Sequence, residues 1–231
     1  MRRLSYFCKR LTRHWRWFAT ALLIFAAWFF IPRQASMTQF DPERMGQLES
    51  DMWRHYYEKN YPLLGSDLFL ASYGQSGFSP WDSTRMAWYA ANAARAAQPT
   101  QPRAQAFTHA LPLLIKYYQV IQKATRSSWQ PEEIAPLELE WWVQRREDKS
   151  WQQYGEAITQ LTAMNYQVPA ARVRPACLLR AELMDYRDQR RGRMQEADWQ
   201  HITSELSKSY QMLKTSVTSS SADSDPPPAI P

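Results

Sequence analysis

Residues 137–146 read Leu-Glu-Leu-Glu-Trp-Trp-Val-Gln-Arg-Arg, a pattern typical of a helix with one broad apolar face. At about 100° per residue, the leucine and tryptophan side chains fall in one arc, and Glu140 and Gln144 fall outside it. Glu138 and Arg145 fall inside the arc, about 10.5 Å apart along the helix axis. A charge on an apolar face is tolerated only when it is paired. We therefore expect each of these two side chains to meet a partner from another helix.

Two interpretations of this stretch stay open. In the favoured one, Glu138 and Arg145 belong to a buried ion network that serves only the fold. In the alternative, they bind a ligand or take part in a reaction, and the neighbouring Trp142 and Arg146 belong to the same site. The alternative would make the protein an enzyme or a cofactor-binding bundle that acts on an apolar or membrane-derived ligand.

Apolar side chains recur at three- and four-residue steps along most of the chain, which predicts an all-α fold. Asp41 followed by Pro42, Ser79 followed by Pro80, and Ser150 are typical helix starts. No segment combines alternating polarity with β-branched residues, so no strand is expected. After the N-terminal segment we expect about seven to eight helices, near residues 42–61, 63–73, 80–97, 103–123, 132–148, 151–165, 170–191 and 196–217.

The composition excludes several classes of protein. Apolar residues make up 45% of the 231 residues and aromatic residues 14%, which excludes a wholly disordered chain. Two cysteines are too few for a disulfide-stapled miniprotein. Only 6 glycines occur and both glycine-rich phosphate-binding motifs are missing, which argues against a dinucleotide-binding fold or a P-loop NTPase.

The net charge of +6 resides in the N-terminus. Residues 1–36 contain seven arginine and lysine side chains and no acidic one. Subtracting those seven from the 28 basic side chains of the whole chain leaves 21, against 22 acidic ones. A basic face on the folded part is therefore not indicated, and no nucleic-acid partner is expected.

Residues 17–31 form a run of fifteen residues in which Thr20 is the only polar one, and they predict a membrane segment. At about 1.5 Å per residue this run spans roughly 22 Å, less than the ~30 Å hydrocarbon core, so the flanking arginines must snorkel or the bilayer must thin. The expected membrane-interface residues are Trp15, Arg16, Trp17, Trp28 and Arg33. A cleaved signal peptide and a buried core helix are the alternatives.

The orientation of this segment follows from the arginines and lysines beside it. Six precede it, and only Arg33 and Arg44 occur in the ~20 residues after it. The N-terminus is therefore expected in the cytoplasm, with the rest of the chain on the far side of the inner membrane, in the periplasm if the source is bacterial.

These observations predict five parts of the chain. They are a basic cytoplasmic N-terminus (1–16), a single-pass transmembrane signal-anchor (17–32), a linker (33–40), a helical domain (41–214) and a disordered tail rich in serine and proline (215–231).

No catalytic or metal-ligating set is apparent in the sequence. Metal sites in helical bundles use Glu-x-x-His pairs, and the nearest patterns are Asp198 with His201 and Asp51 with His55. The Gly-x-Ser-x-Gly motif of the α/β-hydrolases is also missing. We therefore expect no cofactor and no metal, and a non-enzymatic role is favoured over an enzymatic one.

Three short patterns resemble those of an uncharacterised family of bacterial helical proteins. They are Met-Trp-x-x-Tyr-Tyr at residues 52–57, Ala-Leu-Pro-x-Leu-x-x-Tyr-Tyr at 110–118 and Leu-Glu-Leu-x-Trp-Trp-x-x-Arg-Arg at 137–146. The resemblance covers about residues 40–213 and implies a helical fold with no activity attached. The function expected from the sequence is therefore a membrane-anchored, non-enzymatic helical module that binds a protein partner in a membrane complex.

Overall fold

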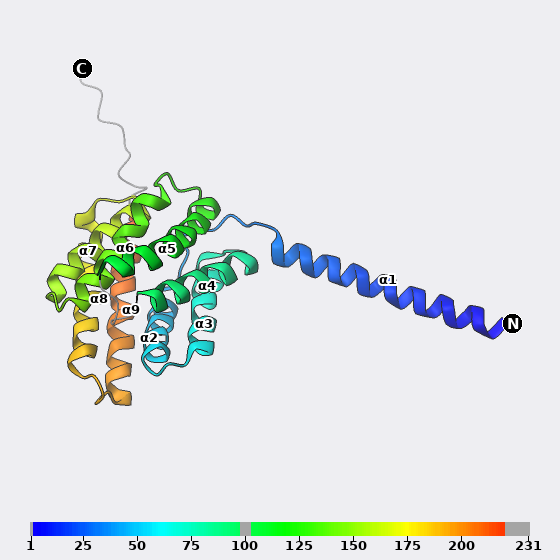
Figure 1. Ribbon diagram of the computed structural model, residues 1–231, viewed down its shortest axis with the longest axis horizontal. Coiled ribbons are helices and arrows are strands. Elements are labelled where there is room, and N and C mark those ends of the chain that lie inside the picture. Colours follow the sequence, from blue (N-terminus) through cyan, green and yellow to red (C-terminus); the bar gives the residue numbers. More distant parts are fainter. Residues whose placement is uncertain (1, 98–102, 220–231) are drawn as a thin grey trace, which may run out of the picture.

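The computed structural model describes residues 2–97 and 103–219, with side chains from residue 15 onward except Arg16. In these ranges the chain forms helices and no strand, so the expected all-α fold is confirmed (Figure 1). Eight helices follow the first one, in line with the seven to eight expected. The elements are α1 (Arg2–Phe30), α2 (Pro42–Tyr57), α3 (Tyr61–Leu70), the π-helical turn η1 (Ala71–Gln75), α4 (Pro80–Ala96), α5 (Arg103–Thr125), α6 (Pro131–Arg146), α7 (Trp151–Tyr166), α8 (Ala170–Gln189) and α9 (Glu196–Thr218).

None of the helices in the described ranges is both long enough and apolar enough to cross a membrane. The transmembrane segment expected at residues 17–32 therefore stays a prediction.

Polar caps start three of the helices where the sequence predicts them. The Asp41 carboxylate accepts a hydrogen bond from the backbone N–H of Arg44 at 2.7 Å, and Pro42 occupies the first turn of α2. The hydroxyls of Ser79 and Ser150 cap α4 and α7 in the same way. Each cap satisfies a backbone donor that has no acceptor within its own helix, which fixes where the helix begins.

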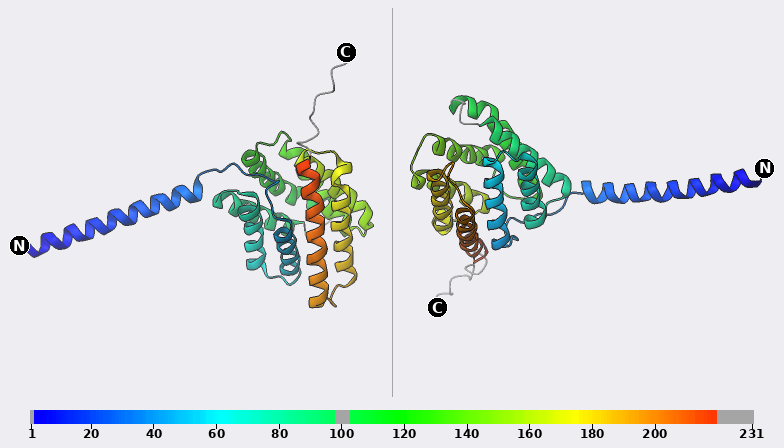
Figure 2. Two further views of the ribbon diagram at one scale, coloured as in Figure 1. Left: turned by 180° about the vertical axis from the view of Figure 1, so that it is seen from behind. Right: turned by 90° about the horizontal axis from the view of Figure 1, so that it is seen from below.

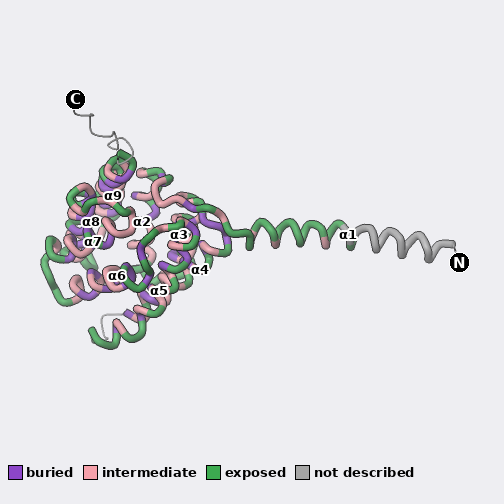
Figure 3. The backbone as a smooth tube through the Cα atoms, turned by 90° about the horizontal axis from the view of Figure 1, so that it is seen from above, coloured by how far each residue is buried: buried purple, intermediate pink, exposed green. Residues whose placement is uncertain are grey.

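The helices α2 to α9 form a closed ring. Each packs against the helix before it and the helix after it in the sequence, and α9 packs back against α2. Figure 2 shows the ring from behind and from below. Seen from above in Figure 3, α1 leaves the ring beside α4, against which it packs. Helical spacing predicts which face of each helix is buried but not which helix covers it, so the closure was not expected.

The seam between α2 and α9 depends on a close approach at Gly46. A Cβ atom at this position would lie 2.6 Å from the backbone nitrogen of Ser207 and 2.7 Å from its Cα. Backbone atoms cannot turn aside as a flexible side chain can, so the seam accepts only glycine here. About one turn along each helix, the Thr203 hydroxyl donates a hydrogen bond to the Ser50 hydroxyl at 2.8 Å.

Residues 33–40, expected as a linker, are hydrogen bonded to the ring. The backbone N–H of Ala35 donates to the carbonyl of Ala124 at 3.0 Å, and that of Ser36 donates to the carbonyl of Ser76 at 2.9 Å. These bonds hold the C-terminal end of α1 close to α5 and η1.

The last helix extends to Thr218, beyond residue 214, where the helical domain is predicted to end. Val217 is buried, and the Ser216 hydroxyl donates a hydrogen bond to the carbonyl of Arg172 on α8 at 2.8 Å. The predicted helix end near residue 217 thus agrees with the structure within one residue, and α9 continues past the domain boundary predicted at 214/215, because these two side chains still pack on the ring. Residues 220–231 of the predicted tail lie outside the described part of the chain.

The substitution Gly46→Ala tests the seam. The added methyl group meets the backbone of α9, so we expect a loss of about 2–3 kcal/mol in the free energy of unfolding, measured by urea titration. The matched control is Gly65→Ala in α3, where no atom lies within 4 Å of the added Cβ. It should be neutral or raise stability by up to about 1 kcal/mol. Equal effects of the two substitutions would contradict a tight seam.

Candidate functional site

Glu138 of α6 faces the inside of the ring, where two uncharged side chains donate hydrogen bonds to it. The hydroxyl of Tyr118 on α5 donates at 2.8 Å, and the indole N–H of Trp142 donates at 2.9 Å. The indole N–H of Trp141 lies near the same carboxylate without reaching hydrogen-bond geometry. The carboxylate is thus held between α5 and α6 by donors that carry no charge.

Burial raises the pKa of Glu138, and the hydrogen bonds from its neighbours and the field of Arg180 partly offset the rise. Burial also raises the pKa values of Tyr117 and Tyr118, and the nearby Glu138 raises them further. Both tyrosine hydroxyls therefore keep their protons at neutral pH and remain able to donate. Glu138 is a carboxylate whose ionised form is disfavoured by its surroundings, which is a property of structural and of catalytic carboxyl groups alike.

The guanidinium of Arg180 on α8 connects the same region to two further helices. It forms an ion pair with Glu49 of α2 at 2.5 Å. Only 4% of the Glu49 side chain is exposed, and its second oxygen accepts a hydrogen bond from the Tyr210 hydroxyl of α9 at 2.5 Å. The guanidinium also lies over Trp141 of α6, 5.6 Å from the ring centroid. Polar contacts around one arginine therefore connect α2, α6, α8 and α9.

Arg145 lies in a second layer of the interior, about two turns along α6 from Glu138. Its guanidinium pairs with Asp188 of α8 at 2.6 Å and donates to the hydroxyl of Tyr57 on α2 at 2.7 Å. Arg187 lies over the Tyr57 ring, 3.0 Å from the centroid, and also pairs with Asp188. Glu138 and Arg145 each have a partner on another helix, which confirms that expectation, and they do not pair with each other.

The four residues of the predicted site lie in three places. Glu138 and Trp142 are in direct contact, whereas Arg145 belongs to the second layer. Arg146 turns toward α4 and donates a hydrogen bond to the carbonyl of Ala97, at the end of that helix. Side chains of residues 137–146 therefore contact two interior layers and the C-terminal end of α4, and they do not line a single pocket.

The interior positions of Glu49, Arg180 and Arg187 were not predicted from the sequence, although each shows the pattern used for α6, a charged residue inside an apolar stripe. At about 100° per residue, Glu49 falls within the apolar stripe of residues 45–56. The two arginines fall within the stripe of residues 173–184 when it is continued by one turn. A charge inside an apolar stripe therefore marks the interior network in three of the helices.

The two pairs nearest to a metal-binding pattern have other partners. The ring nitrogen Nδ1 of His55 is hydrogen bonded to Asp67 of α3 at 2.6 Å and not to Asp51. The carboxylate of Asp198 accepts a hydrogen bond from the hydroxyl of Tyr186 at 2.7 Å. Among the residues that the structure describes, no three histidine, cysteine, aspartate or glutamate side chains are placed to hold a metal ion.

The predicted membrane-interface residues fall into two groups. Trp15 and Trp17 lie on the part of α1 that projects from the ring, and 70% of each side chain is exposed. The side chain of Arg16, between them, lies outside the described residues. Trp28 and Arg33 form the second group, where α1 meets the ring.

Aromatic rings from α1, η1 and α4 gather at this junction. The Arg33 guanidinium lies 5.8 Å from the centroid of Trp28 and 5.7 Å from that of Tyr73 in η1. Trp81, in the first turn of α4, lies with its ring centroid 5.3 Å from that of Phe30. The end of α1 is therefore surrounded by tryptophan and tyrosine from the ring, with one arginine among them.

No protein-family model matches this chain, and neither a curated protein nor a solved structure matches it.

The pair of Glu49 and Arg180 can be tested by a double-mutant cycle. Arg180→Met leaves the buried carboxylate without its cation, so we expect a loss of about 3–5 kcal/mol in the free energy of unfolding. The double variant Glu49→Gln with Arg180→Met should lose about 1–3 kcal/mol less in the free energy of unfolding than the two single variants lose when their losses are added. The control is Arg174→Met, whose ion pair with Glu156 is exposed and should contribute at most about 1 kcal/mol. Strictly additive losses would contradict the coupling of Glu49 and Arg180.

A pH series tests the burial of Glu138. Its pKa in the folded state is raised above the ordinary value of 4.5, so its contribution to stability is fully present below that value and is lost as the pH rises through the raised pKa. Glu138→Gln removes this titration. The stability of the wild type relative to this variant should therefore fall as the pH rises above about 4.5. Urea unfolding over the series measures it, with the exposed Glu132→Gln as the control, and a difference independent of pH would refute the burial.

Proposed function

We propose that this protein is a membrane-anchored helical module that presents the ring to a protein partner at the membrane surface. The observation that carries the proposal is the exposed apolar surface of α1. Leu22, Leu23 and Ile24 are consecutive residues that point to different sides of the helix, and all three are exposed. An apolar surface of this extent in water favours association, so α1 requires an apolar environment.

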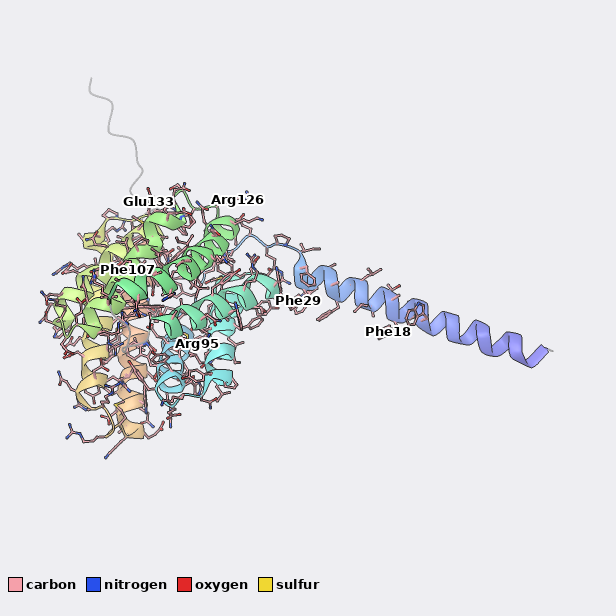
Figure 4. The ribbon with its side chains drawn as sticks, in the orientation of Figure 1. Phe18, Phe29, Arg95, Phe107, Arg126 and Glu133 are labelled. Carbon is pink, nitrogen blue, oxygen red and sulfur yellow. The ribbon has the colours of Figure 1, made fainter. Side chains whose placement is uncertain are left out.

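A lipid bilayer suits this surface. Figure 4 places Phe18 on the part of α1 that stands clear of the ring and Phe29 at the junction with it. Residues 17–30 of α1 extend about 21 Å, which is short of the ~30 Å core, so single-pass insertion requires local thinning of the bilayer or snorkelling of Arg16 and Arg33. Tryptophan at both ends of the apolar run is typical of residues at the headgroup level.

The basic residues before this segment favour a cytoplasmic N-terminus and a ring on the opposite side of the membrane. In a bacterium this arrangement would place the chain in the inner membrane and the ring in the periplasm.

The ring suits the binding of a partner protein because its interior contacts limit how its helices can move. Ion pairs and hydrogen bonds inside the ring join α2, α6 and α8, which are not neighbours around it. A network of this kind restricts rearrangement, so the outer surface keeps one shape for a partner to recognise.

A ligand or proton-transfer site around Glu138 is the second candidate function. Two observations favour it: the raised pKa of Glu138, and the indole N–H of Trp141, which is buried beside the carboxylate without an acceptor. A purely structural Glu138 should leave ligand and partner binding unchanged in Glu138→Gln, whatever the change in stability, because the raised pKa alone already favours a neutral side chain at neutral pH. A functional one would keep or gain thermal stability in that variant while losing ligand or partner binding.

Flotation with lipid vesicles tests the membrane anchor. The purified full chain should float with vesicles of phosphatidylcholine and phosphatidylglycerol in a density gradient. Leu22→Asp combined with Leu23→Asp should abolish flotation, because each aspartate costs about 2.5–3.5 kcal/mol at the centre of a bilayer-spanning helix. Gln119→Asp combined with Gln200→Asp adds the same charge at exposed positions of the ring and should float like the wild type. A wild-type chain that stays with the lipid-free fraction would contradict the anchor.

A further inference from the structure

We propose that a second surface of this protein rests on the same bilayer, namely the outer face formed by Leu63 and Leu70 of α3, Tyr73 of η1 and Trp81 of α4. This set is called the apolar face below. The inference depends on the proposed membrane anchor, because α1 brings the face to the lipid.

None of the four residues of the apolar face is charged. Asp67 is the only charged residue between residues 61 and 81, and it is buried against His55 at 2.6 Å. Leu63 and Leu70 are exposed and lie seven residues apart, which places them on one side of α3. Trp81 is exposed as well, with 40% of its surface open to solvent. An uninterrupted stretch of 21 residues that exposes apolar and uncharged polar groups is not explained by the packing of the ring.

This face is continuous with the apolar surface of α1. Trp81 contacts Phe30, with 5.3 Å between the ring centroids, and Tyr73 meets Trp28 edge-on at 6.4 Å. The guanidinium of Arg33 lies over Trp28 and Tyr73 together. If a membrane buries the apolar part of α1, its surface would therefore lie at the level of Tyr73 and Trp81 of the ring.

The position of the face agrees with contact to lipid. Figures 1 and 3 show α3 and α4 on the side of the ring from which α1 leaves. Among the described residues, the extensive helix contacts of α3 are with α2 and α4, and Leu63 and Leu70 stay exposed on its remaining side. Hydrogen bonds from Ala35 and Ser36 to the ring leave only residues 31–34 between the end of α1 and the first fixed point. This short connection prevents the ring from moving far from the bilayer.

The chemistry of the face favours lipid over a protein partner. Tryptophan and tyrosine are enriched at the level of the headgroups, where the ring is apolar and the N–H or O–H group stays hydrated. Leucine on the same face can enter the boundary of the acyl chains, about 5–10 Å deep. The cation beside the face, Arg33, lies over Tyr73 near the end of α1, where an arginine with its apolar stem is typical of the headgroup level.

Site-specific fluorescence quenching tests the inference on the full chain. In a background of Cys8→Ser and Cys177→Ala, single cysteines are introduced as Leu63→Cys, Leu70→Cys, Phe25→Cys and Gln160→Cys, and each is labelled with an environment-sensitive fluorophore. Phe25 reports on the anchor, and the exposed Gln160 on α7, far from α3 around the ring, is the control. The protein is reconstituted at about one chain per vesicle in phosphatidylcholine and phosphatidylglycerol containing nitroxide-labelled lipid. One series carries the nitroxide near the headgroup and one near the middle of the chain.

We expect the labels at residues 63 and 70 to lose emission to the shallow nitroxide, the label at 25 to lose emission to the deep one, and the label at 160 to be unaffected. Labels at 63 and 70 that behave like the label at 160, with 25 still quenched, would overturn this inference and leave the anchor standing. A label at 25 that is not quenched would overturn the anchor itself. Emission at 63 and 70 that changes with the ratio of protein to lipid, and not with nitroxide, would show that a second copy covers the face.

Discussion

The close approach of α2 and α9 at Gly46 is the constraint on which the rest of the structure depends. It joins the first and last helices of the ring, which are separated by almost the whole helical domain in the sequence. Once the seam is closed, α2 holds Glu49 and Tyr57 toward the interior, where side chains of α6 and α8 can reach them. The seam therefore determines which charged side chains of α2, α6 and α8 come into contact. The interior network in turn stabilises the seam, because Tyr210 of α9 donates a hydrogen bond to Glu49 of α2.

A ring of helices explains why the interior uses arginine, tyrosine and tryptophan. In the described part of the chain, helices that face one another across the ring have no extensive backbone contact, so long side chains fill the space between them. Arginine has a long apolar stem, but its guanidinium requires partners when it is buried. Arg180 forms an ion pair with Glu49 and lies over the ring of Trp141. Arg145 forms an ion pair with Asp188 and donates a hydrogen bond to the hydroxyl of Tyr57. The polar interior thus follows from the geometry of the ring as well as from any function.

The sequence predicts local features of this fold and not its closure. Helix starts at Asp41, Ser79 and Ser150 are local, because each capping side chain and the backbone N–H that donates to it lie within one turn, and they occur where expected. The placement of Glu138 and Arg145 inside an apolar arc is also local. Their partners are not, since Tyr118 and Asp188 are brought to them only by packing between helices. The same limit applies to the domain boundary predicted at 214/215, because the contact of Ser216 with α8 is made only by packing between helices.

The attachment of α1 also determines which surfaces of the ring the proposed partner could reach. Ala124 lies in the last turn of α5 and Ser76 follows η1, so the hydrogen bonds from residues 35 and 36 fasten the segment after α1 to two parts of the ring that are distant in sequence. Because only residues 31–34 separate α1 from these points, and α1 also packs against α4, the freedom of α1 to pivot is restricted. With α1 in a bilayer, α3 and α4 lie toward the lipid, and α7 and α8, on the opposite side in Figure 1, point away from it. A partner outside the membrane would therefore meet α7 and α8 first, and the interior contacts of α8 with α2 and α6 would hold that surface in place.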